Sequence, residues 1–322
     1  MKEIKVTKND SGQRIDRFLS KSFPLGQGQI CKLARKNCIK LNGRKCKPDT
    51  HIAENDIIKL FIPDEMLIPK AKSDPDDFTG VSDKIDIVYE DENILLVDKP
   101  VGMVVHEDDS GDSDTLINRI KSYLYHKGEY HPENELSFAP ALCNRIDRNT
   151  CGIVIAAKNA ESLRILNQKI RDRELTKLYL CIACGKVTPD SATLTAYLEK
   201  NSDTNTVKIS DKKTKSNLTI KTKYKVIAYN GENSLLKVDL LTGRTHQIRA
   251  HLAYIGHALL GDGKYGNNKL NKKYGFKYQA LCSYELQFKF TTDAGCLSYL
   301  DGKCFKAKAP DFVKMFDGNI KL

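Results

Sequence analysis

The chain of 322 residues has no run of eighteen apolar residues, and the segment 1–5 lacks the apolar core of a signal peptide. We therefore expect a soluble, cytoplasmic protein with no membrane partner. Internal repeats and low-complexity tracts are also missing. The apolar content of 40% is enough to build a core, which excludes a disordered protein, and the length suits two domains.

The ten cysteines follow neither a disulfide nor a zinc pattern. In a cytosolic chain such a number indicates reduced thiols. Cys181 and Cys184 form the only close pair, and they lie in an apolar run typical of a buried strand. A zinc ribbon needs a second pair at matching spacing, which Cys296 and Cys304, eight residues apart, do not supply. The pattern disfavours a zinc site.

Positive charge is concentrated at the N-terminal end. The chain carries a formal net charge of +11, and residues 1–72 hold 16 Lys and Arg against 8 Asp and Glu. This first quarter therefore contributes +8 of the total. Such an excess favours a polyanionic partner, and nucleic acid is the leading candidate.

Residues 1–72 show the pattern of a small mixed module. Spacing of apolar residues predicts short helices over 13–19 and 27–36, and a strand over 56–62. Asn42-Gly43 is a strong hairpin signal. The second helix places three cations on one face at i, i+3 and i+4, namely Lys32, Arg35 and Lys36. This face is suited to phosphates, although a solvated charged surface is the alternative.

The acidic segment 73–84 contains Pro, Gly and Ser and few apolar residues, which predicts a linker before a large domain over 85–322. Within that domain, helical spacing occurs at 115–125 and 160–172. Strand-like runs occur at 85–89, 94–97, 178–182, 224–228, 235–241 and 281–288. The two kinds of segment interleave without a regular βαβ repeat. The pattern predicts an α+β domain on a mixed, largely antiparallel sheet.

The loop 144–152 presents one carboxylate, Asp147, between Arg145 and Arg148, and the apolar run 153–157 anchors it. Nearby guanidinium groups favour an ionised carboxylate. That state suits a nucleophile or an electrostatic stabiliser better than a general acid. From this loop alone, a solvated surface turn has about equal weight.

A second cluster, residues 241–252, crowds Arg244, His246, Arg249 and His251 around an expected helix start capped by Thr245. A helix start rich in cations is a good place for an anion. The nearby glycines at 261, 263 and 266 fit a dinucleotide fingerprint by spacing. The polar run after them, however, lacks the apolar periodicity of a packed Rossmann helix. Histidines five residues apart on a helix point away from each other, which disfavours a metal site.

Four motifs together resemble the RluA-type family of RNA pseudouridine synthases. They are the loop 144–152, the segment 98–106 (Asp-Lys-Pro-Val-Gly-Met-Val-Val-His), the strand with Lys177 and Tyr179, and the segment 241–266. Asn144 stands where the family usually has His, and Cys151 where it usually has Ser or another small residue. Residues 13–62 look like an S4-type RNA-binding domain. The resemblance covers most of residues 13–290.

The resemblance implies an isomerase that turns selected uridines, expected in large-subunit ribosomal RNA, into pseudouridine without a cofactor, metal or guide RNA. Asp147 would be the catalytic carboxylate, Arg249 its partner and Tyr179 the ring against the uracil. The implied RNA contacts are Arg145, Arg244 and the S4-like face, with Ile146 and Leu281 in the pocket. A monomer is expected. Two alternatives stay open: a non-catalytic RNA-binding assembly factor, and a metal- or nucleotide-dependent hydrolase.

Overall fold

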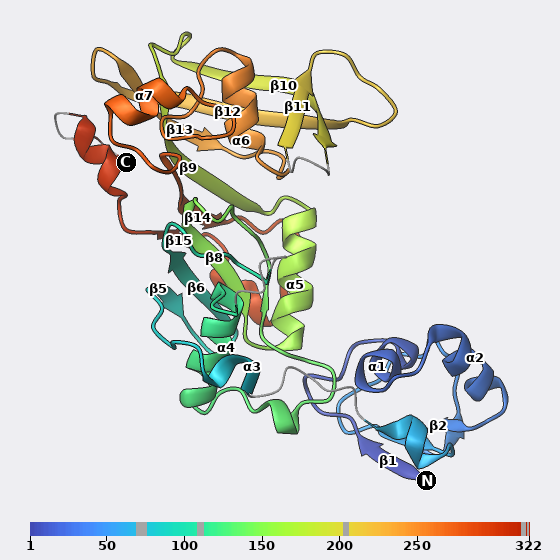
Figure 1. The fold of residues 1–322 in the computed structure, drawn as a ribbon. Helices are drawn as coiled ribbons and strands as arrows, with labels where there is room; N and C mark the ends of the chain where they lie inside the picture. Colours follow the sequence, from blue (N-terminus) through green and yellow to red (C-terminus); the bar gives the residue numbers. More distant parts are fainter. Residues whose placement is uncertain (69–75, 108–112, 202–205, 317–319, 321) are drawn as a thin grey trace.

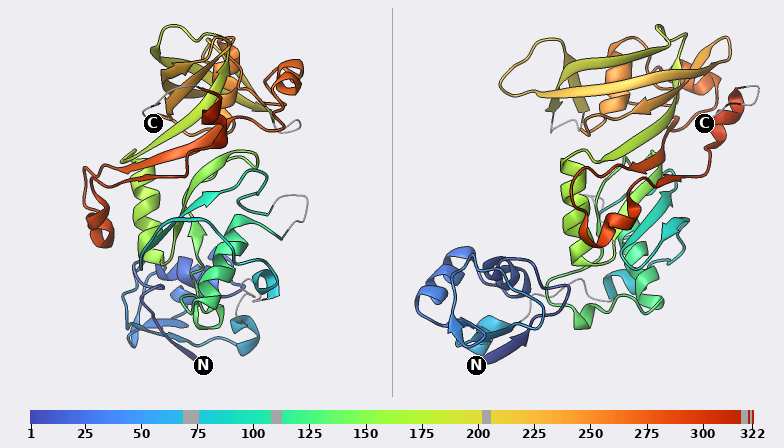
Figure 2. Two further views of the ribbon diagram at one scale, coloured as in Figure 1. Left: turned by 90° about the vertical axis from the view of Figure 1, so that its left-hand side faces the viewer. Right: turned by 180° about the vertical axis from the view of Figure 1, so that it is seen from behind.

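The computed structural model describes residues 1–68, 76–107, 113–201, 206–316, 320 and 322. They form a small N-terminal module and a larger body, which together make an elongated molecule (Figure 1). The module lies at one end, and the strands β10 to β12 lie at the other (Figure 2). None of the helices in the described ranges combines the length and the apolar character needed to span a bilayer.

The N-terminal module packs two helices, α1 (Ile15–Ser22) and α2 (Gln27–Arg35), against a four-stranded sheet in the order β1-β4-β2-β3. The strands are β1 (Lys2–Lys5), β2 (Ile39–Leu41), β3 (Arg44–Lys45) and β4 (Ile57–Leu60). Asn42 and Gly43 have φ of 50° and 77°. These positive angles at both central residues make the predicted two-residue hairpin turn. Lys32, Arg35 and Lys36 are all exposed on α2.

The larger body is organised on an eleven-stranded sheet. Nine strands follow the order β11-β10-β12-β13-β9-β14-β8-β6-β5, while β15 pairs with β14 and β7 with β8. All pairs are antiparallel except β14 with β8. The bounds are β5 (Ile87–Glu90), β6 (Ile94–Lys99), β7 (Ala141–Leu142), β8 (Cys151–Ala157), β9 (Leu175–Cys184), β10 (Ser191–Asn201), β11 (Thr206–Ser210), β12 (Leu218–Tyr229), β13 (Asn233–Asp239), β14 (Leu281–Phe288) and β15 (Cys304–Lys306).

Helices cover both faces of this sheet because its central strands are apolar on both sides. On β6, Leu95 and Val97 face a core that includes residues of α4 and α6, while Ile94 and Leu96 face a core with α5 and η3. The bounds of the helical elements are α3 (Asp76–Thr79), α4 (Leu116–His126), α5 (Ala160–Arg171), α6 (Gln247–Tyr254), α7 (Asn268–Lys273), η1 (Asp64–Leu67), η2 (Pro132–Asn134), η3 (Gly295–Leu300) and η4 (Asp311–Met315). The α+β class with a mixed sheet is therefore confirmed.

Polar contacts dock the module on the larger body. Asn9 donates to Glu135 at 2.6 Å, and its side-chain oxygen accepts from the backbone N–H of Ala160, at the start of α5. Ser137 donates to the buried Asp10 at 2.6 Å and accepts from Gln13 at 2.9 Å. These bonds fix the first residues of the module against the body.

Three sequence-based expectations need comment. The division at 73–84 stays a prediction, but Phe78, inside that segment, is buried against Tyr125 and Tyr130 of the larger body. The expected cap at Thr245 is wrong: α6 begins at Gln247, and the residue before it, His246, has a left-handed φ of 52°. Strands β10 and β11 were not expected, although Leu194, Ala196 and Leu198 alternate with polar residues along β10.

Candidate active site

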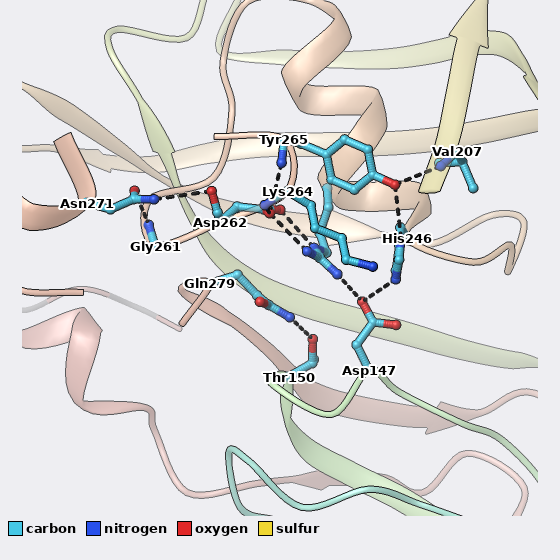
Figure 3. Close-up of polar contacts among 11 residues, drawn as sticks. Asp147, Thr150, Val207, His246, Gly261, Asp262, Lys264, Tyr265, Asn271 and Gln279 are labelled. Atoms are coloured by element: carbon cyan, nitrogen blue, oxygen red, sulfur yellow. Dashed lines mark hydrogen bonds and ion pairs between the residues drawn. The ribbon is translucent and has the colours of Figure 1, made fainter. Parts of the chain in front are cut away.

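The loop that carries Asp147 is held directly before β8. The backbone N–H of Thr150 donates to the carbonyl of Asp147 at 3.0 Å, and Thr150 accepts from Gln279 at 3.2 Å (Figure 3). Asn144 accepts a bond from the backbone N–H of Ile155 at 2.8 Å, so its amide closes the loop on the strand. Gly152 has φ of 107°, and a Cβ there would lie 2.2 Å from the carbonyl oxygen of Ser283. Glycine is therefore required for β8 to approach β14.

Lys99 supports the same loop from β6. Its side chain is fully buried, and Nζ donates to three backbone carbonyls, those of Pro100, Met103 and Arg148, at 2.8 to 2.9 Å. Burial lowers the pKa of Lys99 to about 8, while Cys151 and Asp147 act in the opposite direction. Three acceptors match the three protons of an ammonium group. Lys99 thus fixes the backbone immediately after Asp147.

Arg249 joins two carboxylates. Its Nε and Nη2 donate to the two oxygens of Asp262 at 2.8 and 2.9 Å, and Nη1 donates to Oδ2 of Asp147 at 2.8 Å. Asp262 has no exposed side-chain surface, whereas 28% of the Asp147 side chain is exposed. Burial opposes the charge on Arg249, but the two carboxylates raise its pKa overall. The buried acid anchors the guanidinium, and the remaining nitrogen serves the accessible acid.

The carboxylate of Asp262 is itself fixed by backbone donors. Its Oδ1 accepts from the N–H groups of Lys264 and Tyr265 at 2.8 and 3.1 Å (Figure 3). Burial raises the pKa of Asp262, but the bonds from Arg249 and from these N–H groups outweigh it, and the pKa is lowered overall. Asn271 in turn donates to the backbone carbonyl of Asp262 and accepts from Gly261. The turn 261–266 therefore holds the Asp262 carboxylate, as an anion, in a fixed position beside Arg249.

His246 also lies near Oδ2 of Asp147, the oxygen that Arg249 contacts. Its Nε2 is 3.8 Å from Oδ2 of Asp147, and its Nδ1 is 3.0 Å from the hydroxyl of Tyr265. Burial lowers the pKa of His246; Asp147 raises it and Arg249 lowers it. A lowered pKa keeps the imidazole neutral at pH 7. The Tyr265 hydroxyl accepts from the N–H of Val207 at 2.9 Å, which connects the site to β11.

Asp147, His246 and Arg249 line a cleft with a volume of about 800 Å³. The predicted site residues that share it are Arg145, Ile146, Asp147, Tyr179, Arg244, Arg249 and Leu281. Tyr179 is 5% exposed, and burial raises its pKa to about 12, so the phenol is neutral. The exposed side chains of Arg145 and Arg244 lie at the rim. Lys32, Arg35 and Lys36 belong to the separate N-terminal module and do not line this cleft.

The other two histidines near the site lie within hydrogen-bond distance of protein oxygens through Nδ1. His251 Nδ1 lies 3.0 Å from the hydroxyl of Thr222, and His257 Nδ1 lies 3.0 Å from the carbonyl of Cys184. Within the described ranges, no group of three His, Cys, Asp or Glu side chains has the arrangement of a metal site.

The site thus presents an acid in a cleft lined by several arginines, built on a mixed sheet. A family profile described as RNA pseudouridylate synthase matches residues 93–254, half of the chain. The chain belongs to the RNA pseudouridylate synthase family. It is an isomerase that converts uridine to pseudouridine in RNA. The predicted activity is therefore confirmed, and the alternative of a non-catalytic RNA-binding factor is not supported.

Individual relatives agree with this assignment. The chain is 35% identical over 291 residues to an uncharacterized RNA pseudouridine synthase of Mycoplasma genitalium, which covers 88% of each chain. It is 32% identical over 268 residues to the ribosomal large subunit pseudouridine synthase D of Borreliella burgdorferi, covering 81% of this chain and 78% of that protein. The fold is similar to that of human RNA pseudouridylate synthase domain containing 1, with a TM-score of 0.56 and 20% identity over 74% and 91% of the two chains.

Proposed function

We propose that this enzyme isomerises specific uridines of large-subunit ribosomal RNA, with Asp147 as the reacting carboxylate. The observation that carries the proposal is the Asp147 carboxylate in the cleft, 2.8 Å from an Arg249 that is itself locked to Asp262. The arrangement gives the acid a fixed position and a permanent counter-charge before substrate arrives. Such preorganisation is a large source of catalytic rate.

The reaction needs the N1–C1′ bond of uridine to break, the uracil to turn, and C5 to bond to C1′. The proton on C5 is released, and N1 gains one. Asp147 acts either as a nucleophile at C1′ or as the group that removes a sugar proton from an intermediate; both routes use an ionised carboxylate. Tyr179, neutral and packed in the cleft wall, offers its ring to the uracil.

A uridine inside a helix must leave the base stack before its C1′ can meet Asp147. We assign Arg145 to the vacated place in the stack, because it is exposed and lies two residues from Asp147. Arg244, exposed on the loop before α6, is assigned to a phosphate. Ile146 and Leu281, both buried, form the apolar floor of the pocket.

Two features support large-subunit ribosomal RNA as the substrate and an RNA-binding role for the N-terminal module. The relatives from Borreliella burgdorferi and Vibrio vulnificus are named ribosomal large subunit pseudouridine synthases D and C. The N-terminal module, with two helices, a small sheet and the exposed cations Lys32, Arg35 and Lys36, is proposed to act as an S4-like RNA-binding domain. Its boundaries, 1–72 for the module and 85–322 for the catalytic domain, are part of the proposal.

The test is to map pseudouridines in ribosomal RNA from cells with and without this protein. A site that disappears from large-subunit RNA, and returns with the parent gene but not with Asp147→Asn, supports the proposal. Tritium release from 5-tritiated uridine in the transcribed RNA then measures turnover. Loss of a site only in transfer RNA or small-subunit RNA would contradict the assigned substrate.

A further inference from the structure

Helix α5 begins next to the N-terminal module and runs away from it into the larger body (Figure 1). Its first residue, Ala160, is hydrogen-bonded to Asn9 of the module, and its last residue, Arg171, lines the cleft. Twelve residues make a helix of about 18 Å. The two regions are therefore separated by the length of one short helix.

The exposed side of this helix is cationic. Arg164, Gln168 and Arg171 are spaced i, i+4 and i+7 and are all exposed, so they form one stripe along the helix. Leu166 and Lys169, on the opposite side, are buried. Gln168 donates to Asp172 at 2.6 Å and accepts from Arg171, which holds the end of the stripe in place. At the cleft, exposed Arg173 extends the same basic surface.

At its other end the stripe meets two cations of the module. Arg17 and Lys21 are exposed on α1, and Arg164 lies against the segment before this helix, where its Nη2 would be 2.9 Å from a Cβ on Gly12. Partial desolvation lowers the pKa of Lys21, Arg164 and Arg17 lower it further, and Asp10 raises it. We name Arg17, Lys21 and Arg164 the junction cluster.

Crowding of like charges costs free energy in the absence of an anion. Within the described parts of the chain, none of the three side chains of the junction cluster forms a salt bridge. Among the described residues, Lys21 donates to the amide oxygen of Gln13 alone, at 3.3 Å. The cluster also depends on docking of the module, because Arg164 comes from the body and the other two from α1. A bound anion would relieve the repulsion and stabilise the docked arrangement.

We propose that the RNA strand flanking the target uridine leaves the cleft along α5 and places its phosphates against Arg171, Arg164, Arg17 and Lys21. From Arg164 to Arg171 the stripe rises about 10 Å, which is too long for a single phosphate to cover. A polyphosphate backbone matches both the length and the continuity with the cleft. This inference rests on the proposed function, since it takes structured ribosomal RNA as the substrate.

The test is RNA binding against salt concentration for the double variant Arg164→Gln/Lys21→Gln. Loss of two phosphate contacts reduces the slope of log K against log salt by about 1.4 to 1.8 units. The matched control is Lys272→Gln/Lys277→Gln, which removes two exposed cations on and after α7 and should keep the parent slope. The probe is transcribed large-subunit ribosomal RNA. Circular dichroism verifies that each variant is folded.

Two further measurements separate the possible failures. Single-turnover tritium release at saturating RNA should equal that of the parent, because neither residue lines the cleft. A parent slope in the double variant, or an equal reduction in the control, overturns the α5 path. If the parent protein itself neither binds this RNA nor releases tritium from it, the proposed substrate is wrong, and the path fails with it.

Discussion

Arg249 lies between Asp147 and Asp262 and contacts both, with three of its nitrogens within 2.9 Å of carboxylate oxygens. The two contacts are unequal. Two nitrogens hold the fully buried Asp262, and one nitrogen reaches the partly exposed Asp147. Arg249 is therefore held in a fixed position by Asp262. Asp147, which faces the cleft, is the carboxylate that stays accessible.

Asp147→Asn should abolish turnover and leave RNA affinity within a few-fold of the parent. The substitution keeps the size and the polarity of the side chain but removes the charge that both proposed routes need. Tritium release measures turnover, and filter binding measures affinity. Turnover within a few-fold of the parent would falsify the assignment of Asp147.

Arg249→Lys should retain more activity than Arg249→Met, but less than the parent. An ammonium group keeps the charge, yet it has no planar fork and cannot hold Asp262 with two bonds while reaching Asp147. Methionine leaves two acids without their cation. The measurement is the single-turnover rate at saturating RNA. Equal rates in all three proteins would mean that Arg249 has no role in the reaction.

Asp262→Asn should reduce stability at pH 7 by about 3 kcal/mol, the lower end for breaking a buried ion pair, because Asp147 still contacts Arg249. The pKa of Asp262 is lowered on folding, so its contribution is present above about pH 4 and is lost as the pH falls further. The difference in stability between parent and variant should therefore shrink as the pH falls below about 4. Urea unfolding at several pH values tests this, and a constant difference would contradict it.

The sequence was sufficient for the elements whose signal is local. The Asn42-Gly43 turn, α4 and α5 depend on turn residues and helical spacing that can be read from a few neighbouring residues. The resemblance also identified Asp147 and Arg249 as partners, and the structure places them in contact.

The rest of the site depends on tertiary contacts. Asp262 lies in a turn 13 residues after Arg249, and only the folded chain brings its carboxylate onto the guanidinium. The Lys-Pro-Val-Gly segment that begins at Lys99 belongs to one of the motifs of the resemblance. No local sequence pattern, however, predicts that the Lys99 ammonium group donates to the carbonyl of Arg148, 49 residues away. The residue that caps α6 is His246, one residue after the expected cap at Thr245. His246 has a left-handed backbone, and because it is not a glycine the sequence gives no signal for that conformation.

Removal of divalent metals should leave activity unchanged. The proposed chemistry uses the Asp147 carboxylate with Arg249 as its counter-charge, and within the described residues no three His, Cys, Asp or Glu side chains have the arrangement of a metal site. Enzyme dialysed against excess chelator should release tritium from RNA at the parent rate. The RNA must be refolded and checked in the same buffer, because its own structure can depend on Mg²⁺. A loss of activity that added zinc restores would contradict the expectation.

Removal of residues 1–72 should weaken RNA binding while largely preserving the isomerisation step at saturating RNA. The segment carries +8 of the net +11 charge, but none of its described residues, 1–68, lines the cleft. If it makes about four phosphate contacts, the slope of log K against log salt should shallow by 3 to 4 units. Asn9, Asp10 and Gln13 also dock the module on the body, so the fragment must first be shown to be folded.

The matched control for this truncation is the full-length triple variant Lys32→Gln/Arg35→Gln/Lys36→Gln, which keeps the module but removes the exposed cations of α2. Three lost contacts should reduce the salt slope by about 2 to 3 units, and the single-turnover rate should stay at the parent value. Selectivity among uridines should fall in the truncated protein, because we propose that the module sets the register of the RNA over Asp147. An unchanged salt slope in both proteins would show that residues 1–72 do not anchor the RNA. A lost single-turnover rate in a folded fragment would show that the module takes part in the isomerisation step itself.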